Sequence, residues 1–172
     1  TYEGEVKLLD FGIARQISAR GGEDSGVVRG KPRYMPPEQI AGEGIDQRTD
    51  LYAVGVMAWE AAAGVRLWAN ASDAELMQAV QAGEIPTPSS VTDGVDPELE
   101  RIVMRALAPD KEQRYPTALA MQTDLDSFLG ISGTQLRSRD IGAVVCRLFA
   151  DRRDQTEAIV ADQLARLATL SE

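Results

Sequence analysis

The side chain best placed to do chemistry near the start of the sequence is the carboxylate of Asp10. Residues 5–9 (EVKLL) alternate and then become apolar, which predicts a short strand, and Asp10 follows it directly, two residues before the flexible Gly12. Residues 13–29 are polar and without a sustained period, which predicts a long loop of the kind that is often functional. Taken alone, Asp10 is best explained as a carboxylate that caps a turn.

The composition limits what these 172 residues could do on their own. The sequence has no histidine, which removes a histidine general base and a histidine-containing zinc site, and its single cysteine, Cys146, cannot form an internal disulfide. The 27 acidic residues outnumber the 18 basic ones and give a net charge of −9, which argues against a nucleic-acid partner or an anionic membrane surface. We therefore expect a cytoplasmic protein that does not bind nucleic acid.

The elements that must position these residues are organised around one apolar stretch, residues 51–63 (LYAVGVMAWEAAA). Glu60 is its only charge, so a helix here would be apolar on almost every side and is expected to be buried all round. With Asp50 and Glu60 so close together, the apolar run is too short to cross a bilayer, and no membrane span is expected. Gly64 is expected to end the helix in the left-handed conformation.

Three further helices are expected between this stretch and the tail. Ser72 and Glu75 have the spacing of a capping box before a helix that ends near Ala82, and Asp96 can cap the next helix. A third helix is expected to open at Pro116 and to turn several apolar side chains inward. These side chains are Leu119, Met121, Leu125, Phe128 and Leu129. Helix follows helix, which predicts a mainly α fold.

The last segment, residues 130–172, begins with a small-residue linker and then carries two apolar stripes at helical spacing. The first stripe comprises Ile141, Val144, Val145, Leu148 and Phe149, and the second comprises Ile159, Val160, Leu164 and Leu167. Two helices are expected here, which either pack back on their own domain or contact a partner such as a second copy of the chain. Cys146 is expected to be a small core residue rather than a reactive thiol.

Four motifs occur in a fixed order: KLLDFGIAR at 7–15, GKPRYMPPEQ at 30–39, TDLYAVGVMAWE at 49–60 and APDKEQRYPTA at 108–118. In this order and spacing they resemble the C-terminal lobe of a bacterial-type serine/threonine protein kinase. The resemblance implies a helical bundle around one buried central helix, with a short N-terminal strand and a helical tail. It divides the chain into a partial kinase domain at 1–129 and a linker with two amphipathic helices at 130–172.

The resemblance assigns roles to the first motif. Asp10 matches the aspartate of the family's DFG motif (here Asp10, Phe11 and Gly12), which holds the Mg²⁺ that bridges the ATP phosphates and neutralises charge on the transferring group. Phe11 matches the phenylalanine whose packing separates active from inactive states, although simple filling of the core would also account for it. ATP and Mg²⁺ are therefore the cofactors expected in the full-length protein.

The second motif and the loop before it match the family's activation segment. Ser25 lies where relatives carry a loop phosphosite, and Ser18 is the other candidate, although a serine in such a loop is commonly only a solubilising residue. The expected substrate-facing loop comprises Gly30, Lys31, Pro32, Arg33 and Tyr34. Lys31 stands where most relatives have threonine, which bears on substrate preference, and its alternative is a solvated loop lysine.

Three more residues take roles from the resemblance. Glu38 matches the glutamate of the APE motif, which the family pairs with an arginine at the place of Arg114, so we expect a bidentate ion pair between them. Local pattern alone would make Arg114 a surface arginine in a polar turn. Asp50 matches an aspartate that accepts backbone N–H bonds from the catalytic loop, and an ordinary helix cap is its alternative.

The resemblance also implies what these residues lack. The family's glycine-rich loop, its strand lysine and its catalytic loop would all precede Thr1, so the catalytic base and the phosphate-binding lysine are not in this chain. The expected function is that of a fragment of an ATP-dependent serine/threonine kinase, which phosphorylates protein substrates with its missing N-lobe in cis and is inactive alone. The alternative is a stand-alone, kinase-derived interaction module without catalysis.

Overall fold

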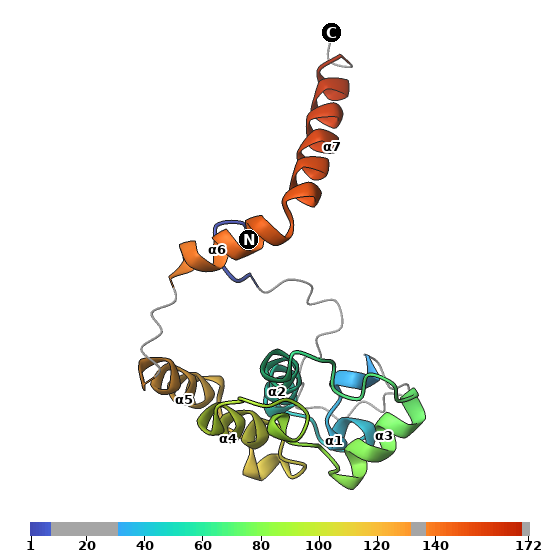
Figure 1. Cartoon of the computed structure of the whole chain (residues 1–172). Helices are drawn as coiled ribbons and strands as arrows, with labels where there is room; N and C mark the ends of the chain where they lie inside the picture. The colour runs from blue at the N-terminus through green and yellow to red at the C-terminus, as the bar shows by residue number, and fades with distance from the viewer. Residues whose placement is uncertain (8–30, 132–136, 170–172) are drawn as a thin grey trace. The chain divides into compact units, whose positions relative to one another are not determined.

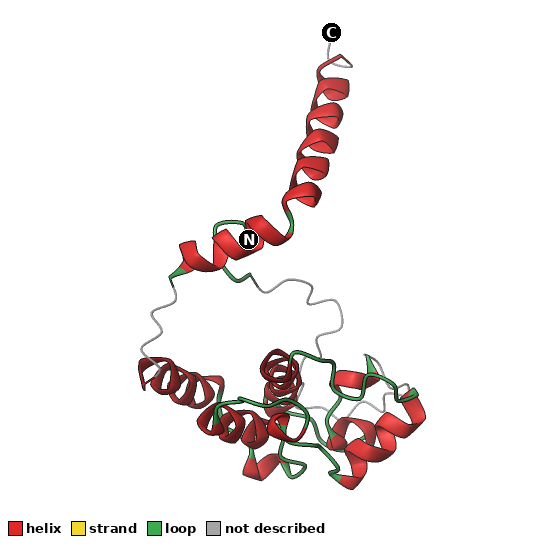
Figure 2. Ribbon diagram, viewed as in Figure 1, coloured by secondary structure: helices red, strands yellow, loops and turns green. Residues whose placement is uncertain are grey.

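The computed structural model describes residues 1–7, 31–131 and 137–169. Within these ranges the regular elements are all helical and no strand is present, which confirms the mainly α fold (Figure 2). The chain forms two compact units, one of residues 12–133 and one of residues 1–11 together with 134–172. None of the helices in the described ranges is long and apolar enough to span a membrane.

The larger unit is built around one long helix. This helix, α2 (Arg48–Ala63), packs along α4 (Pro97–Ala106), and α4 packs in turn against α5 (Ala118–Ile131) (Figure 1). Gly55 allows the close approach of α2 and α4, because a Cβ at this position would lie 3.0 Å from the Cβ of Ala106. The remaining elements of this unit are η1 (Pro32–Tyr34), α1 (Pro37–Ile40), α3 (Asp73–Ala82), η2 (Pro88–Ser90) and η3 (Lys111–Gln113).

The ends of α2 follow from local chemistry. At its start the Asp46 carboxylate accepts a 2.8 Å hydrogen bond from the Arg48 N–H, one of the donors that the helix leaves free. At its end Gly64 takes the left-handed conformation with φ of 68°, and its N–H donates to the Glu60 carbonyl over 2.9 Å. The predicted helix and its glycine stop are thus confirmed. Trp59 is buried in the core and donates its indole N–H to the Pro86 carbonyl over 2.7 Å.

One side of α2 is exposed, which corrects the expectation of a helix buried all round. Met57 is 54% exposed and Val54 is 38% exposed, and Asp50 and Ala61 are exposed at the same helical spacing. These four residues form the exposed stripe of α2. The sequence was misleading because an apolar face shows that burial is favourable, but it does not show that a neighbour in the same chain covers that face.

The other predicted caps are present. Ser72 and Glu75 form the capping box of α3, with the Ser72 N–H donating to the Glu75 carboxylate over 2.8 Å. The Asp96 carboxylate caps α4 by accepting the Glu98 N–H over 2.8 Å. In α5, Met121 is buried but Leu119 is 70% exposed, which corrects its assignment to the core. Two positions along a helix correspond to about 200° of rotation, so these two residues face opposite ways.

The smaller unit contains α6 (Ser138–Leu148), α7 (Ala150–Thr169) and the first residues of the chain. Of the strand expected at 5–9, the described residues 5–7 are loop, since no other described strand offers them a partner. The N-terminal backbone lies so close to α6 that a Cβ on Gly142 would be 2.6 Å from the Tyr2 carbonyl oxygen. Cys146 is half-buried and its thiol donates to the same carbonyl over 3.5 Å.

Candidate functional site

The structure describes only part of the set of residues that the sequence assigns to the site. Asp10, Phe11, Gly12, Ser18, Ser25 and Gly30 lie outside the described residues. The substrate-facing loop is described from Lys31, and the expected ion pair and Asp50 are described in full. In the described ranges, no three acidic or thiol side chains gather into a group that could hold a metal ion. Asp10, the expected Mg²⁺ ligand, is not among the residues of these ranges.

Glu38 and Arg114 lie together in a bidentate ion pair. The Nη1 and Nη2 atoms of Arg114 each donate a 2.8 Å hydrogen bond to one oxygen of the Glu38 carboxylate. Arg114 is 2% exposed and Glu38 is 6% exposed, so the pair is shielded from water. Parallel hydrogen bonds between charged partners are the strongest of their kind, and they fix both position and orientation.

The other donors of Arg114 are used as well. Its Nε donates to the Ala108 carbonyl over 2.7 Å, and Nη2 also donates to the Pro109 carbonyl over 3.1 Å. Nη1 makes a longer contact of 3.4 Å with the Arg48 carbonyl at the start of α2. One guanidinium therefore links α1, α2 and the segment after α4. A lysine could not make these contacts together, because it lacks the planar set of donors.

Thr49 and Tyr52 complete the surroundings of the pair. The Thr49 hydroxyl donates to the Glu38 carboxylate over 3.2 Å, and the ring of Tyr52 lies 4.9 Å from the guanidinium carbon of Arg114. Burial alone would raise the pKa of Glu38, but hydrogen bonds from Arg114, from the backbone and from Thr49 together hold this pKa below its ordinary value. Glu38 is thus the charged partner that Arg114 requires.

The sequence pattern did not predict a special environment for Tyr52. Its hydroxyl is buried and has no hydrogen-bond partner among the described residues, and burial raises the pKa of this group well above its ordinary value. One signal in the sequence could have drawn attention to Tyr52: it is a tyrosine in an otherwise apolar helix. A tyrosine hydroxyl that is buried in such a helix usually requires a hydrogen-bond partner.

A second ion-pair network lies at the surface, near the start of α2. Arg48 donates to the Glu112 carboxylate over 2.7 and 2.8 Å and to the Asp46 carboxylate over 2.8 Å. Hydrogen bonds from the Arg48 side chain, which outweigh the effect of burial, lower the pKa of Asp46 to about 2. The network joins the turn before α2 to η3 and so holds the fourth motif next to the third.

Asp50 is exposed in the first turn of α2 and is the third residue of that helix. It is therefore not the residue that caps α2, because the cap position is held by Gln47 and the capping carboxylate belongs to Asp46. Its carboxylate is on the exposed stripe together with Val54 and Met57. The anchoring of a catalytic loop by Asp50 stays a prediction.

The loop that the sequence predicts to face the substrate borders a shallow groove. Arg33 is half-buried and its guanidinium donates to the carbonyls of Leu67 and Trp68, the latter over 3.1 Å, which ties η1 to the loop after α2. The groove has a volume of about 290 Å³. It is lined by Lys31, Pro32, Arg33, Tyr34, Arg66 and Asp73, and we call it the η1 groove.

Comparison with known proteins supports the family suggested by the motifs. The profile described as "Protein kinase domain" matches residues 1–125. The chain is 38% identical over 153 residues to the tyrosine-protein kinase MasK of Myxococcus xanthus, which covers 89% of this chain and 24% of MasK. It is 34% identical over 126 residues to the serine/threonine-protein kinase PknL of Mycobacterium tuberculosis, covering 73% of this chain and 32% of PknL.

A third similar protein is also named a protein kinase. The serine/threonine-protein kinase Pkn1 of Myxococcus xanthus is 40% identical over 125 residues, which is 72% of this chain and 18% of Pkn1. The chain therefore spans less than a third of the length of each of these three relatives.

Proposed function

Because this chain belongs to the protein kinase family, we propose that it is the helical C-terminal part of the catalytic domain of a bacterial-type serine/threonine kinase. The full-length protein would transfer the γ-phosphoryl group of ATP to serine or threonine residues of a protein substrate. The observation that carries this proposal is the family match over residues 1–125, in which Glu38 of the second motif and Arg114 of the fourth form one buried pair. This ion pair holds the second and fourth motifs together in the folded unit.

The proposed specificity for serine and threonine rests on two of the three relatives. PknL and Pkn1 are named serine/threonine-protein kinases, whereas MasK is named a tyrosine-protein kinase. Acid hydrolysis of a substrate labelled by the full-length protein separates these possibilities. Phosphoserine or phosphothreonine is the expected product, and label found only on tyrosine would overturn this part of the proposal.

Asp10 is the residue of this chain proposed to act in the chemistry. A carboxylate oxygen is the hard ligand that Mg²⁺ prefers, and Mg²⁺ bound with ATP would neutralise charge on the phosphate oxygens. The other residues of this chain would help to hold the reacting groups in position. Since positioning and electrostatics supply most of the catalysis of phosphoryl transfer, the 172-residue chain alone is proposed to be inactive without the upstream base and lysine.

The exposed stripe of α2 supports a requirement for the upstream part of the protein. Val54 and Met57 present apolar surface to water on the central helix of the larger unit, where a neighbour is normally expected. We propose that the kinase N-lobe and its connection, in the same polypeptide, cover this stripe, with Asp50 as an acceptor for backbone N–H groups. The alternative of a stand-alone interaction module predicts instead that the stripe is available to another protein.

The helices of the tail support a proposal about self-association of the protein. On α7, Ile159 is 62% exposed and Leu164 is 61% exposed, so their stripe does not pack against the described residues. Contact with a second copy of the chain through these helices is the proposal that we retain. Analytical ultracentrifugation of the full-length protein with Leu164→Glu tests it, because a dimer held by this stripe would dissociate.

A further inference from the structure

Among the described residues 31–131, the cations that neither a carboxylate nor a backbone carbonyl holds lie at the η1 groove. Between residues 31 and 131 the chain has eight lysine and arginine residues. Five of them pair with carboxylates within the described residues: Arg48, Arg101, Arg105, Lys111 and Arg114. A sixth, Arg33, is held by two backbone carbonyls. The two that remain are Lys31 and Arg66, and both line the same groove.

The fold, and not proximity in the sequence, brings the backbones of Lys31 and Arg66 to the same groove. Lys31 precedes η1, and Arg66 lies in the loop after α2, which is held by two contacts. Arg33 binds two carbonyls of that loop, and the Glu60 carboxylate accepts the Leu67 N–H over 3.2 Å. Both Lys31 and Arg66 are exposed, so their charged groups are free to meet a ligand.

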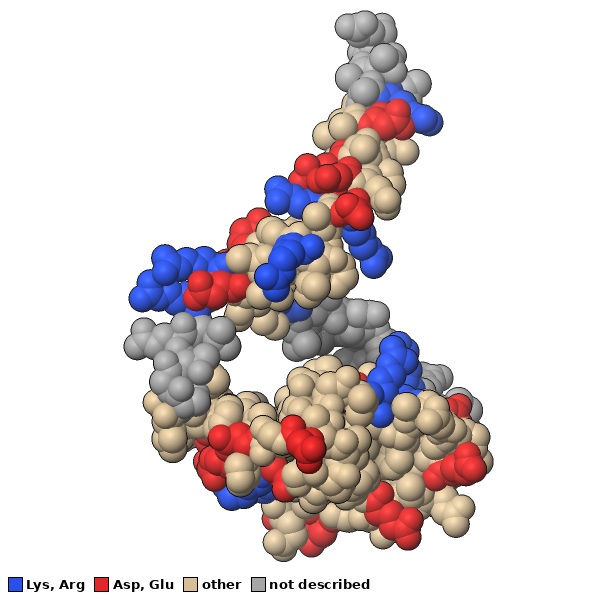
Figure 3. Space-filling view, in the orientation of Figure 1, with Lys and Arg blue, Asp and Glu red and all other residues tan. Residues whose placement is uncertain are grey.

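The groove is basic on an acidic protein. Among the described lining residues, Asp73 at the first position of α3 is the one acidic side chain, against the cationic side chains of Lys31, Arg33 and Arg66. Figure 3 shows a basic patch at the end of this unit where η1 lies and a second one at the lower left, which lies beside acidic side chains. Since the whole sequence carries a net charge of −9, this is a local reversal of sign.

The dimensions of the groove indicate the size of its ligand. About 290 Å³ is at the lower limit of sites for small molecules, and a nucleotide would need a deeper enclosure. Pro32 and Tyr34 give the groove apolar walls, against which the methylene groups of a side chain can pack. A single side chain that ends in a carboxylate or phosphate fits both the volume and the charge.

We propose that the η1 groove binds an anionic side chain of the protein substrate, close to the residue that is phosphorylated. This inference rests on the proposed kinase function, because that function makes the loop from Lys31 to Tyr34 face the substrate. Carboxylate and phosphate share the chemistry that Lys31 and Arg66 recognise. The kinase would therefore prefer acidic substrates or substrates that already carry a phosphate beside the acceptor.

Peptide phosphorylation by the full-length protein tests the preference. A series of peptides with one acceptor would carry glutamate, phosphoserine, glutamine or lysine at each of about three positions on either side of it. At one or more positions we expect kcat/KM for the glutamate or phosphoserine peptide to exceed that for glutamine by about three- to tenfold, which corresponds to one or two exposed charge pairs. The larger of the two ratios identifies the preferred anion.

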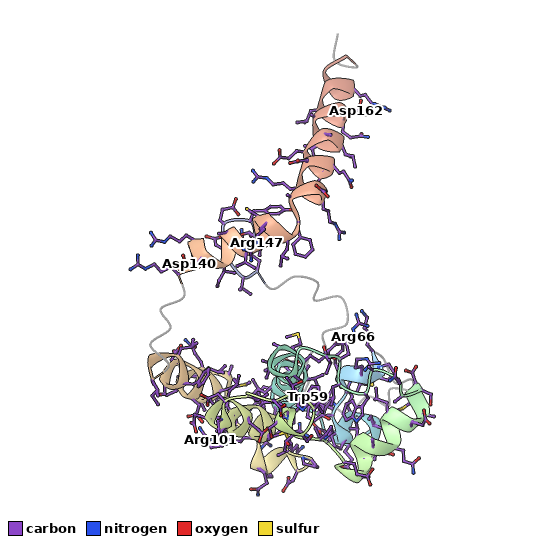
Figure 4. All side chains as sticks on the ribbon, viewed as in Figure 1. Trp59, Arg66, Arg101, Asp140, Arg147 and Asp162 are labelled. Carbon is purple, nitrogen blue, oxygen red and sulfur yellow. The ribbon has the colours of Figure 1, made fainter. Side chains whose placement is uncertain are left out.

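Substitution of Arg66 assigns the preference to the groove. Arg66→Gln should lower the ratio of glutamate to glutamine, and Arg66→Glu should reverse it in favour of lysine. The matched control is Arg101→Gln, which removes an exposed cation on α4 that already pairs with Glu98. Figure 4 labels Arg66 and Arg101, which lie at different ends of the unit in this view. An acid preference that Arg66→Gln leaves unchanged, or no acid preference at any position, would overturn the inference.

A binding measurement separates this inference from the proposed function. Fluorescence anisotropy of the labelled glutamate and glutamine peptides reports their affinity for the full-length protein whether or not it transfers phosphate. The glutamate peptide should bind more tightly, less so with Arg66→Gln and less so in high salt. Equal affinity for both peptides would contradict the groove, whereas selective binding without any phosphorylation would contradict the kinase proposal alone.

Discussion

The guanidinium of Arg114 meets the carboxylate of Glu38 through two parallel hydrogen bonds of 2.8 Å, although the two residues are 76 positions apart in the sequence. Both side chains are buried, and every nitrogen of the guanidinium has an acceptor within the unit. The pair therefore joins α1, which follows η1, to the turn before α5. Neither partner can be removed without leaving the other charge in a poorly solvated place.

Loss of either partner should destabilise the larger unit strongly. We expect Arg114→Ala or Glu38→Ala to lower the free energy of unfolding by roughly 3 to 5 kcal/mol, because the remaining charge is left buried and unpaired. Arg114→Lys should also be costly, since a lysine keeps the charge but loses the second parallel donor and the carbonyl contacts. Urea titration of the full-length protein measures these changes.

The control for this prediction is an exposed ion pair. Arg101 donates to Glu98 over 2.7 Å with about half of each side chain exposed, so Arg101→Ala should cost at most about 1 kcal/mol. If Arg114→Ala costs no more than Arg101→Ala, the buried pair does not hold the motifs together.

The Asp46 carboxylate should make stability depend on pH in the acid range. Its pKa falls from the ordinary value of 3.8 to about 2 in the folded chain, chiefly through hydrogen bonds from Arg48. Because folding favours the charged form, this contribution is complete above about pH 4 and is lost as the pH falls through about 2. The destabilisation caused by Asp46→Asn should therefore shrink between pH 6 and pH 2 in urea titrations. The same loss of stability at both pH values would contradict the assignment.

The exposed stripe of α2 should be tolerant in the 172-residue chain and sensitive in the full-length protein. We expect Met57→Lys to change the unfolding free energy of the chain little, because the side chain is already 54% exposed. In the full-length protein the same change should lower the melting temperature and the activity, since it would place a charge under the proposed N-lobe.

Leu119→Lys is the matched control for the stripe. Leu119 is 70% exposed on α5, away from the exposed stripe of α2, so its substitution should be tolerated in both proteins. Equal tolerance of Met57→Lys in both proteins would mean that nothing upstream covers α2.

Local signals in the sequence predicted the helices well. The capping box of Ser72 and Glu75, the Asp96 cap and the Gly64 stop all act over a few residues, so their spacing is sufficient to predict them. Two of the errors concern which side of a helix is buried. Leu119 and the stripe of α2 are apolar but exposed, and hydrophobicity alone does not tell which neighbour is present.

The surroundings of the Glu38–Arg114 pair could be predicted only in part. The family resemblance names the two partners, but the carbonyls of Ala108 and Pro109 that also bind Arg114 depend on backbone geometry that no motif records. The η1 groove was likewise not predicted, because Lys31 and Arg66 come from different motifs and meet only in the folded unit. Long-range placement of this kind requires the tertiary structure.

Autophosphorylation should begin on Ser25. A phosphate adds about two negative charges and orders a loop by pairing with arginines, and the family resemblance implies such a site at Ser25. Mass mapping of peptides from the full-length protein incubated with ATP should find phosphate on Ser25 before Ser18. Earlier or exclusive labelling of Ser18 would contradict the assignment.

Asp10 is proposed to be the Mg²⁺-binding carboxylate of a working kinase domain, and phosphate transfer from labelled ATP by the full-length protein, with and without Asp10→Asn, tests this directly. We expect transfer to protein serine or threonine by the unaltered protein, loss of at least about a thousandfold with Asp10→Asn, and little change in melting temperature, because the substitution affects the metal and not the core. The 172-residue chain alone should show no turnover. Near-normal transfer by the Asp10→Asn protein, or Asp10-dependent turnover by the isolated chain, would contradict the account.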